Sequence, residues 1–257
     1  MKNSINILHF DDVYLQQTFY KASKVASIDL TDLKNVSRFC ELSTLQIIAR
    51  RLKQAHNSIS FIGNGNHHYV TLLFLAKVPV PFTLVLFDHH TDMAISPSES
   101  LVSCGSWVTK ALHTIPQLKK VILVGTADEL ANEIPPLFDS KVIVFTQKQV
   151  KRYHWLKYSI GAAVPTKVIY VSIDKDVLSK TEAVTNWDQG DMTLTQLLSI
   201  LYYLGTIKHI CGMDVSGEYA TDPVIALNPT TREFARKNSH ANKALLQTSE
   251  KITRQAG

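Results

Sequence analysis

The sequence lacks the features that would place the chain in a membrane or outside the cell. No apolar run approaches the roughly 20 residues of a membrane span, and the apolar stretch at the start is too short for a secretion signal. The three cysteines, Cys40, Cys104 and Cys211, are widely separated and form no CxxC pair. We therefore expect a reduced, cytoplasmic setting and no membrane contact.

Long polar tracts, internal repeats and heptad runs are also absent from the sequence. A length of 257 residues with 45% hydrophobic content is enough to bury a substantial core. We expect a single domain over residues 1–257. The net charge of +5 comes from scattered Lys and Arg, without a basic stripe interleaved with aromatic residues, so we expect no nucleic-acid binding.

Short runs rich in Val, Ile, Leu and Phe alternate with longer stretches that can form amphipathic helices. The runs are nearly all apolar, which is typical of parallel strands that are covered on both faces. The pattern predicts an α/β fold with a central, mostly parallel sheet. The expected strands are Ile5–Phe10, Ser58–Ile62, Thr83–Phe87, Lys120–Val124, Lys141–Phe145, Lys167–Ser172 and Lys208–Gly212.

Three segments have the periodicity of helices. Ser43 and Gln46, near the start of the first segment, form the pattern of a capping box. Thr193, of a residue type that commonly caps helices, precedes the second segment. The predicted helices are Thr44–Ala55, Leu194–Leu204 and Thr231–Lys251.

Polar clusters directly follow three of the predicted strands, where sites in open α/β sheets lie. The clusters occupy residues 63–68 (Gly-Asn-Gly-Asn-His-His), 88–92 (Asp-His-His-Thr-Asp) and 174–176 (Asp-Lys-Asp). Residues two apart in an extended segment point the same way. Asp88, His90 and Asp92 would therefore share one face and Asp174 and Asp176 another, while the residues between them would face elsewhere.

Carboxylates brought together repel one another and resist ionisation unless a cation neutralises them. One ion would leave part of this ligand set unused, whereas two ions bridged by carboxylates would employ all of it. Oxygen-rich ligation with imidazole and no thiolate favours Mn²⁺, and Fe²⁺, Zn²⁺, Co²⁺ and Ni²⁺ are compatible with it. The sequence thus predicts a site for two divalent metal ions.

The three clusters resemble, in order and spacing, the metal-binding motifs of the arginase and agmatinase (ureohydrolase) family. The family's Gly-Gly-Asp-His-Ser is similar to residues 64–68, its Asp-Ala-His-Ala-Asp to residues 88–92, and its Ser-Phe-Asp-Val-Asp to residues 172–176. The resemblance extends from about Ile62 to Glu218. It implies an arginase-like fold, a three-layer α/β/α sandwich around a parallel sheet, and assembly into a homo-oligomer is common among such proteins.

The resemblance also implies a ligand set for a manganese pair and a small-molecule substrate. Asp92 and Asp174 would be among the bridging carboxylates. The implied metal ligands are His67, Asp88, His90, Asp92, Asp174 and Asp176.

Residues 212–218 (Gly-Met-Asp-Val-Ser-Gly-Glu) are similar to the family segment in which an acid faces the substrate guanidinium. Glu218 is a candidate substrate ligand there, although it comes one residue late, and Asp214 is a candidate partner of a metal ligand. Asp188 could help Glu218 receive a cationic substrate, and Trp187 could supply a stacking wall.

The sequence departs from the family pattern at the proton shuttle. Arginases place His-Gly after the second motif, whereas this chain has Cys104 followed by Gly. A thiol transfers protons when its pKa lies near the working pH. His68 and His113 are the replacement candidates, and Asn66 stands where the first motif usually has Asp.

The expected activity is hydrolysis of a linear C–N bond in a guanidine, amidine or amide, through a hydroxide that bridges the two metal ions and that Asp92 orients. Two alternatives stay open. One is a deacetylase-like amidohydrolase that uses a single zinc. The other is a metal-binding relic of the fold that has lost catalysis.

Overall fold

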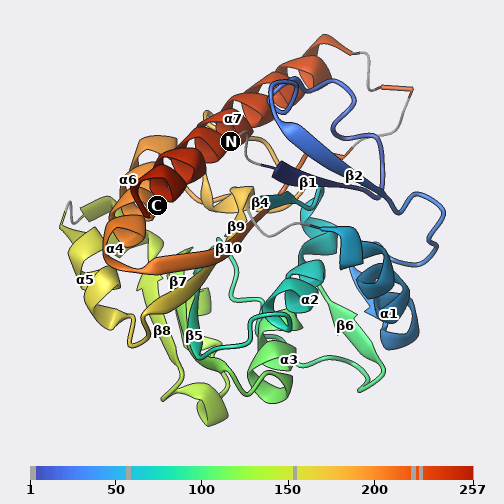
Figure 1. Cartoon of the computed structure of the whole chain (residues 1–257). Helices are drawn as coiled ribbons and strands as arrows, with labels where there is room; N and C mark the ends of the chain where they lie inside the picture. Colours follow the sequence, from blue (N-terminus) through green and yellow to red (C-terminus); the bar gives the residue numbers. More distant parts are fainter. Residues whose placement is uncertain (1–3, 56–58, 153–154, 221–223, 226–227, 257) are drawn as a thin grey trace.

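The computed structural model describes residues 4–55, 59–152, 155–220, 224–225 and 228–256. Its centre is an eight-stranded sheet in which every pairing is parallel, with the order β2-β1-β4-β10-β9-β5-β7-β8 (Figure 1). The strands are β1 (Ser4–His9), β2 (Lys24–Asp29), β4 (Ile59–Phe61), β5 (Phe82–Phe87), β7 (Leu118–Thr126), β8 (Val142–Thr146), β9 (Val168–Asp174) and β10 (His209–Ser216).

Alternating side chains of each central strand enter two separate hydrophobic clusters. In β5 every residue is buried, with Val85 and Phe87 in one cluster and Leu84 and Leu86 in the other. Both faces of the sheet are therefore covered, which explains the continuous apolar runs in the sequence.

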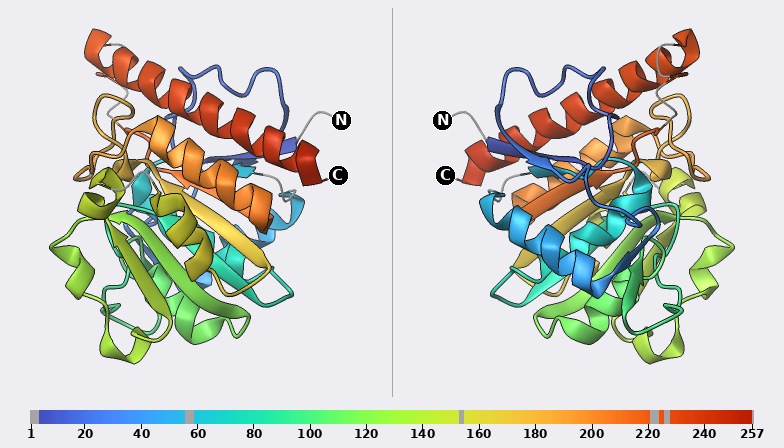
Figure 2. Two further views of the ribbon diagram at one scale, coloured as in Figure 1. Left: turned by 90° about the vertical axis from the view of Figure 1, so that its left-hand side faces the viewer. Right: turned by 90° about the vertical axis from the view of Figure 1, so that its right-hand side faces the viewer.

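Helices cover each face of the sheet as a separate layer (Figure 2). Side chains of α4, α5, α6 and α7 contribute to the first cluster, and side chains of α1, α2 and α3 contribute to the second. The predicted three-layer α/β/α sandwich is confirmed. The helices are α1 (Leu42–Arg51), α2 (Thr71–Leu75), α3 (Trp107–Thr114), α4 (Gln147–Arg152), α5 (Leu156–Ala163), α6 (Leu194–Ile207) and α7 (Pro229–Ala256).

All seven predicted strands form, with ends shifted by a few residues, and Ser58 lies outside the described residues. The three predicted helices also form. The capping box predicted for α1 is wrong, because this helix starts at Leu42 with Glu41 as its N-cap, and no side chain caps it. Thr193 does cap α6, in a complete capping box with Gln196.

A second, two-stranded sheet lies beside the main one. Its strands β3 (Phe39–Glu41) and β6 (Leu101–Ser103) are antiparallel, with Phe39 opposite Ser103. The backbone pairing continues past the strands, since the Cys104 amide donates to the Arg38 carbonyl at 2.9 Å. This ribbon holds residues 38 and 104 side by side.

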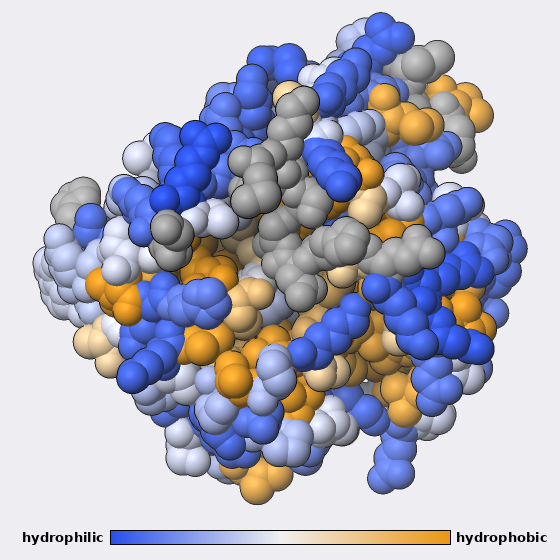
Figure 3. All heavy atoms as spheres, in the orientation of Figure 1, coloured by the Kyte–Doolittle hydropathy of each residue, from blue (hydrophilic) through white to orange (hydrophobic). Residues whose placement is uncertain are grey.

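Hydrophilic residues cover most of the face drawn in Figure 3, and hydrophobic atoms appear there as separate patches. The outer side of α7 belongs to the hydrophilic part. None of the helices in the described ranges combines the length and the apolar character needed to cross a bilayer.

Candidate metal centre

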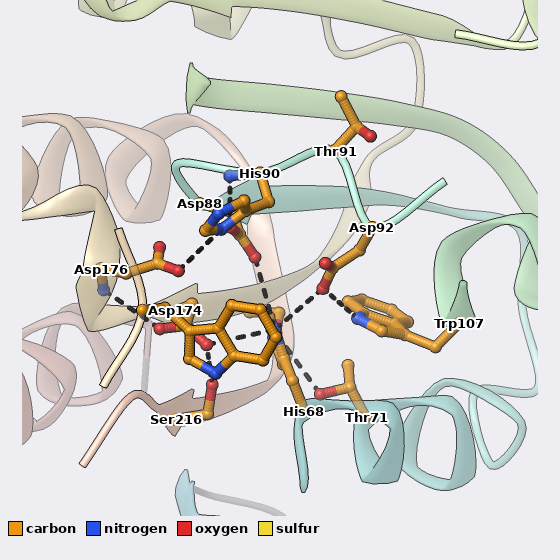
Figure 4. Close-up of polar contacts among 12 residues, drawn as sticks. His68, Thr71, Asp88, His90, Thr91, Asp92, Trp107, Asp174, Asp176 and Ser216 are labelled. Atoms are coloured by element: carbon orange, nitrogen blue, oxygen red, sulfur yellow. Dashed lines mark hydrogen bonds and ion pairs between the residues drawn. The ribbon is translucent and has the colours of Figure 1, made fainter. Parts of the chain in front are cut away.

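The two acidic motifs meet at the carboxyl ends of adjacent strands. Asp88, His90 and Asp92 follow β5, while Asp174 ends β9 and Asp176 lies in the short 3-10 turn after it. The two strands pair in parallel from Phe82 to Phe87, so both motifs leave the sheet at the same edge (Figure 4). The strand pairing thus concentrates four carboxylates in one place.

His68 is the centre of a first group of ligand atoms. Its Nδ1 lies 3.1 Å from Asp92 Oδ2, 3.4 Å from Asp88 Oδ2 and 3.5 Å from Asp174 Oδ2. The imidazole comes from η2 (Gly65–Val70), the 3-10 turn that follows β4. All four side chains are almost fully buried.

His90 forms a second group beside the first. Its Nδ1 lies 2.9 Å from Asp176 Oδ2 and 3.6 Å from Asp88 Oδ1. Asp88 therefore turns one oxygen toward each histidine and stands between the two groups. Asp92 contacts only the His68 group, so the geometry gives no support to the prediction that Asp92 bridges two ions.

His67, a predicted metal ligand, does not reach the cluster. Its ring stacks on Phe10 with centroids 4.0 Å apart, and its Nδ1 is buried without a hydrogen-bond partner. Burial lowers its pKa to about 3. The prediction for His67 fails for a local reason. Residues 65–70 coil into the η2 turn, where successive side chains point in different directions. His68, predicted as a proton-transfer candidate, occupies the place expected for His67.

Buried hydroxyl and carboxyl groups hold His68 from behind. Its Nε2 lies 2.9 Å from Ser172 Oγ, which donates to Asp214 Oδ1 at 2.7 Å. The Asp214 carboxylate also accepts from Tyr170 and from Thr71. Asp214 therefore orients the imidazole through Ser172, as its prediction as a partner of a ligand anticipated.

Further donors fix the carboxylates themselves. Ser216 Oγ donates to Asp174 Oδ2 at 2.6 Å, and Trp107 Nε1 donates to Asp92 Oδ2 at 2.5 Å. Asp92 has a φ of +52°, in the left-handed region that residues other than glycine rarely adopt. The fold thus holds Asp92 in a strained conformation at the cluster.

The pKa values show how unfavourable this concentration of charge is for the protein alone. Burial, together with the charge of Asp88, raises the pKa of Asp92 to about 6, and burial raises the pKa of Asp174 and Asp176. Burial lowers the pKa of His90, but Asp176 and Asp88 outweigh it and raise the value to about 12. Four carboxylates around two imidazoles leave an excess of negative charge.

The arrangement fits divalent cations. Ligand atoms of His68, Asp88 and Asp92 all lie within 4.8 Å of one another, and the same holds for Asp88, His90 and Asp176. The donors are carboxylate oxygens and imidazole nitrogens, which suit Mn²⁺ and related ions. Positive charge would offset the burial and the mutual repulsion that together raise the pKa values of Asp92, Asp174 and Asp176.

A cavity of about 410 Å³ opens over the cluster. Its lining includes Cys104, Trp187, Thr91 and Arg38. Burial raises the pKa of the Cys104 thiol to about 12, so this cysteine is no thiolate at neutral pH in the metal-free chain. His113, the other shuttle candidate, is exposed on α3 and is not a lining residue.

Glu218, a predicted substrate ligand, is only 1% exposed and is not among the residues that line the cavity. It forms a buried ion pair with Lys175, and it accepts hydrogen bonds from Gln17 at 2.7 Å, Asn242 at 2.7 Å and Asn238 at 3.0 Å. These partners satisfy its carboxylate completely. The extra residue before Glu218, noted in the sequence, places the acid in this network instead of the site.

The other predicted substrate residues lie in one loop and have different surroundings. Trp187 lines the cavity, its Nε1 donates to Asn66 Oδ1 at 3.0 Å, and its ring meets that of His90 edge to face. Asp188 is exposed and is not a lining residue. The structure therefore brings Trp187 to the site, but not Asp188 or Glu218.

Comparison with known proteins agrees with this architecture. The chain matches the model of the arginase family over residues 5–222. It is 30% identical over 214 residues to an uncharacterized protein of Thermotoga maritima, which covers 83% of this chain and 79% of that protein. Its fold is similar to formimidoylglutamase from Bacillus subtilis, with a TM-score of 0.68, 14% identity and coverage of 96% of this chain and 87% of that one. It is also similar to proclavaminate amidino hydrolase from Streptomyces clavuligerus, with a TM-score of 0.67, 16% identity and coverage of 97% and 92%.

The chain belongs to the arginase family, as the resemblance of its three motifs predicted. Members of this family are hydrolases with a binuclear metal centre, typically of Mn²⁺. The candidate ligand groups for such a centre are present in this chain.

Proposed function

We propose that this protein is a metal-dependent hydrolase of linear C–N bonds in guanidines, amidines or amides. One observation carries the proposal: two groups of ligand atoms share Asp88 directly beneath a cavity. A structural metal site is closed to solvent, whereas a catalytic one keeps an open side for substrate and water.

The two groups of ligand atoms would together hold two divalent ions, with Mn²⁺ as the favoured metal. When bound, they would supply a nucleophile from water at neutral pH and stabilise the negative charge that develops as the planar C–N carbon is attacked. The proposed ligands are His68, Asp88, His90, Asp92, Asp174 and Asp176.

Asp92 is the residue best placed to hold the proton of the attacking water. Trp107 Nε1 and His68 Nδ1 both contact its Oδ2, which leaves Oδ1 to orient the water and accept its proton. The positive φ of Asp92 and the Trp107 hydrogen bond fix this orientation before substrate arrives.

Cys104 lines the cavity and is our candidate for returning a proton to the leaving amine. Burial raises the pKa of this thiol to about 12, so in the metal-free chain it holds its proton. It would give that proton up only if bound cations brought its pKa down toward the working pH. Leaving as an amine requires this proton, because an amide anion is too basic to depart.

The test is to purify the chain without chelators or a histidine tag, load it with Mn²⁺, and measure metal per chain by elemental analysis. The loaded protein is then assayed against guanidines, amidines and acylated amines. We expect close to two ions per chain and hydrolysis of at least one class. Asp174→Asn and His90→Ala should lose metal and activity, while Asp139→Asn, an exposed control, should retain both.

Other outcomes distinguish the alternatives. One tightly held zinc with release of acyl groups would identify the deacetylase-like enzyme. A chain with two ions that hydrolyses none of the panel would identify the non-catalytic relic and overturn our proposal.

A further inference from the structure

The cavity contains a cationic feature that the metal ligands do not explain. Among the described lining residues, Arg38 is the only arginine or lysine. The expectation of a cationic substrate rested on Glu218 and Asp188, and neither faces the cavity. The charge of the outer part of the site is therefore set by the residues that line the cavity, to which Glu218 and Asp188 do not belong.

Arg38 is positioned by its backbone. Its carbonyl accepts from the Cys104 amide at 2.9 Å, and its own amide donates to the Asn66 carbonyl at 3.1 Å. The β3–β6 ribbon and the η2 turn, which carries His68, thus both hold residue 38. Its φ of +67° is in the left-handed region, so a bulky side chain is retained at a position that glycine would occupy with less strain.

The Arg38 side chain is aimed as well as anchored. Its guanidinium carbon lies 5.1 Å from the centre of the Trp187 ring, a cation–π contact. Trp187 is fixed in turn by its hydrogen bond to Asn66 and by the edge-to-face contact with His90, at 5.8 Å between ring centres. A single aromatic ring therefore separates the guanidinium from a proposed metal ligand.

The hydrogen-bonding groups of this guanidinium are available to a ligand. Within the described part of the chain, Arg38 forms no ion pair and its side chain donates no hydrogen bond. Arg51 shows the contrasting case, since two of its nitrogens pair with Asp32. A guanidinium that stacks on an aromatic ring keeps its edge free, and that edge matches a carboxylate bidentately.

We propose that Arg38 and Trp187 form a subsite for a carboxylate on the substrate. The substrate is then an amino acid derivative or similar acid whose hydrolysable C–N group lies over the acidic cluster while its carboxylate pairs with Arg38. The position of the C–N group in this inference rests on the proposed hydrolase activity. The contact between Arg38 and the carboxylate does not depend on it.

A subsite for an ammonium group, the opposite of a carboxylate, is supported by one residue. Glu133 also lines the cavity and would suit an ammonium group. Both residues are exposed, and neither forms an ion pair with another described residue. Two backbone hydrogen bonds and the Trp187 ring fix Arg38, whereas Glu133 follows the short turn η3 (Leu130–Asn132) and its side chain has no such support among the described residues. The carboxylate is therefore the favoured ligand, and the ammonium is an outcome of the test.

The experiment compares substrates that differ only in the tail. Guanidines, formamidines and acetamides of linear amines, in several chain lengths, are made with a carboxylate, a methyl or an ammonium end, and kcat/KM is measured with the Mn²⁺-loaded protein. We expect the carboxylate series to be preferred. Arg38→Gln should reduce its kcat/KM about ten- to a hundredfold, the loss typical of a charged hydrogen bond, and leave the methyl series unchanged.

Matched variants control for charge and folding. Arg50→Gln removes the same charge from an exposed position on α1 and should have no effect on the preference. Arg38→Lys keeps the charge but loses the planar fork, so it should recover part of the preference, which a variant that merely disturbed the loop would not do.

A binding measurement separates the subsite from the chemistry. Hydrolysis of every compound in the series leaves the amine, so 4-aminobutanoate and butylamine are titrated calorimetrically into the loaded protein. The acid should bind about tenfold more tightly or better, and the difference should vanish in Arg38→Gln.

The outcomes are distinct. If nothing in the series is hydrolysed but the acid binds through Arg38, the proposed function fails and the subsite stands. If hydrolysis occurs with no carboxylate preference, with one that Arg38→Gln leaves intact, or with a preference for the ammonium tail, the subsite proposal is overturned and the hydrolase stands.

Discussion

At the residue scale, two adjacent histidines have opposite surroundings. His68 contacts three carboxylates, whereas His67 stacks on Phe10 and its buried Nδ1 has no hydrogen-bond partner among the described residues. Removal of a residue that merely hydrogen-bonds to a metal ligand typically costs about ten- to a hundredfold in metal affinity. His68→Ala removes a proposed ligand itself, so it should lower the affinity for Mn²⁺ by at least that much. His67→Ala should retain the affinity and reduce only the stability.

Competition with a fluorescent chelator measures both affinities. The pair of variants is its own control, since each removes one imidazole from the same turn. Loss of Mn²⁺ in His67→Ala with full binding in His68→Ala would show that the ligand is the residue the motif comparison first indicated.

Lys175 and Glu218 form a buried ion pair whose two side chains are almost inaccessible to solvent. Burial lowers the pKa of Lys175, so its charge depends on the partner. Lys175→Met or Glu218→Gln alone should lower the free energy of unfolding by about 3–5 kcal/mol, because each leaves an uncompensated buried group. The double variant should lose less than the sum of the two.

Denaturant unfolding of the metal-free protein measures this non-additivity. A coupling of more than about 1 kcal/mol is expected for groups in direct contact. Additive losses would mean that the two side chains act independently.

The sequence was sufficient to predict five of the six clustered side chains, because strand ends and the two-residue period decide where Asp88 and Asp174 point. It was insufficient for the first motif, where two histidines fit the pattern and only the coiling of η2 selects His68. Arg38 left no signal, since its approach to the cavity depends on the pairing of β3 with β6. Ser172 did have a signal, two residues before Asp174 in a predicted strand.

At the scale of elements, α6 has the most complete local signals. Thr193 accepts from the Gln196 amide at 3.2 Å, and the Gln196 side chain accepts from the Thr193 amide at 2.9 Å. Thr193→Ala should lower the free energy of unfolding by about 1 kcal/mol, the usual value of a cap.

Metal content should stay unchanged in this variant, since α6 packs on the sheet face through its apolar side. Unfolding curves and elemental analysis on the same preparation check both expectations. A Thr193→Ala protein of wild-type stability would show that tertiary packing maintains the helix without the cap.

Element prediction failed where local patterns were weak or ambiguous. The edge strand β2 reads Lys-Val-Ala-Ser-Ile-Asp and is mostly exposed, so it lacks the apolar run of a central strand. At α1 a cap pattern was present at Ser43, but this residue lies inside the first turn and its hydroxyl donates to Glu41 Oε2 instead. Tertiary pairing, absent from a local pattern, decides both cases.

At the scale of the whole molecule, the acidic cluster should make the metal-free protein less stable as the pH rises. The pKa of Asp92 is raised from 3.8 to about 6 by burial and Asp88, and that of Asp214 is raised to about 6 by burial. A raised carboxyl pKa stabilises the folded state fully below pH 3.8, and the contribution is lost as the pH rises through about 6. The raised pKa of His90 acts in the same direction above pH 6.5.

The lowered pKa of His67 acts in the opposite direction, but only below its unfolded value of 6.5. Thermal unfolding of the metal-free protein should therefore occur at a lower temperature at about pH 9 than at about pH 7. Mn²⁺ should raise the unfolding temperature more at the higher pH, because it binds deprotonated ligands. Greater stability of the metal-free protein at the higher pH would show that the carboxylates are not in conflict with one another.

The position of β10 in the sheet has a consequence for the order of events during synthesis. It pairs with β4 on one side and β9 on the other, and it supplies the link between β2-β1-β4 and β9-β5-β7-β8. On the ribosome the first three strands emerge early, but they have no partner across this gap until residue 216 has left the exit tunnel. Ser216, which holds Asp174, arrives with the same strand. The sheet and the proposed ligand cluster are therefore complete only once β10 has been made, so binding of metal at that cluster would follow the synthesis of this strand.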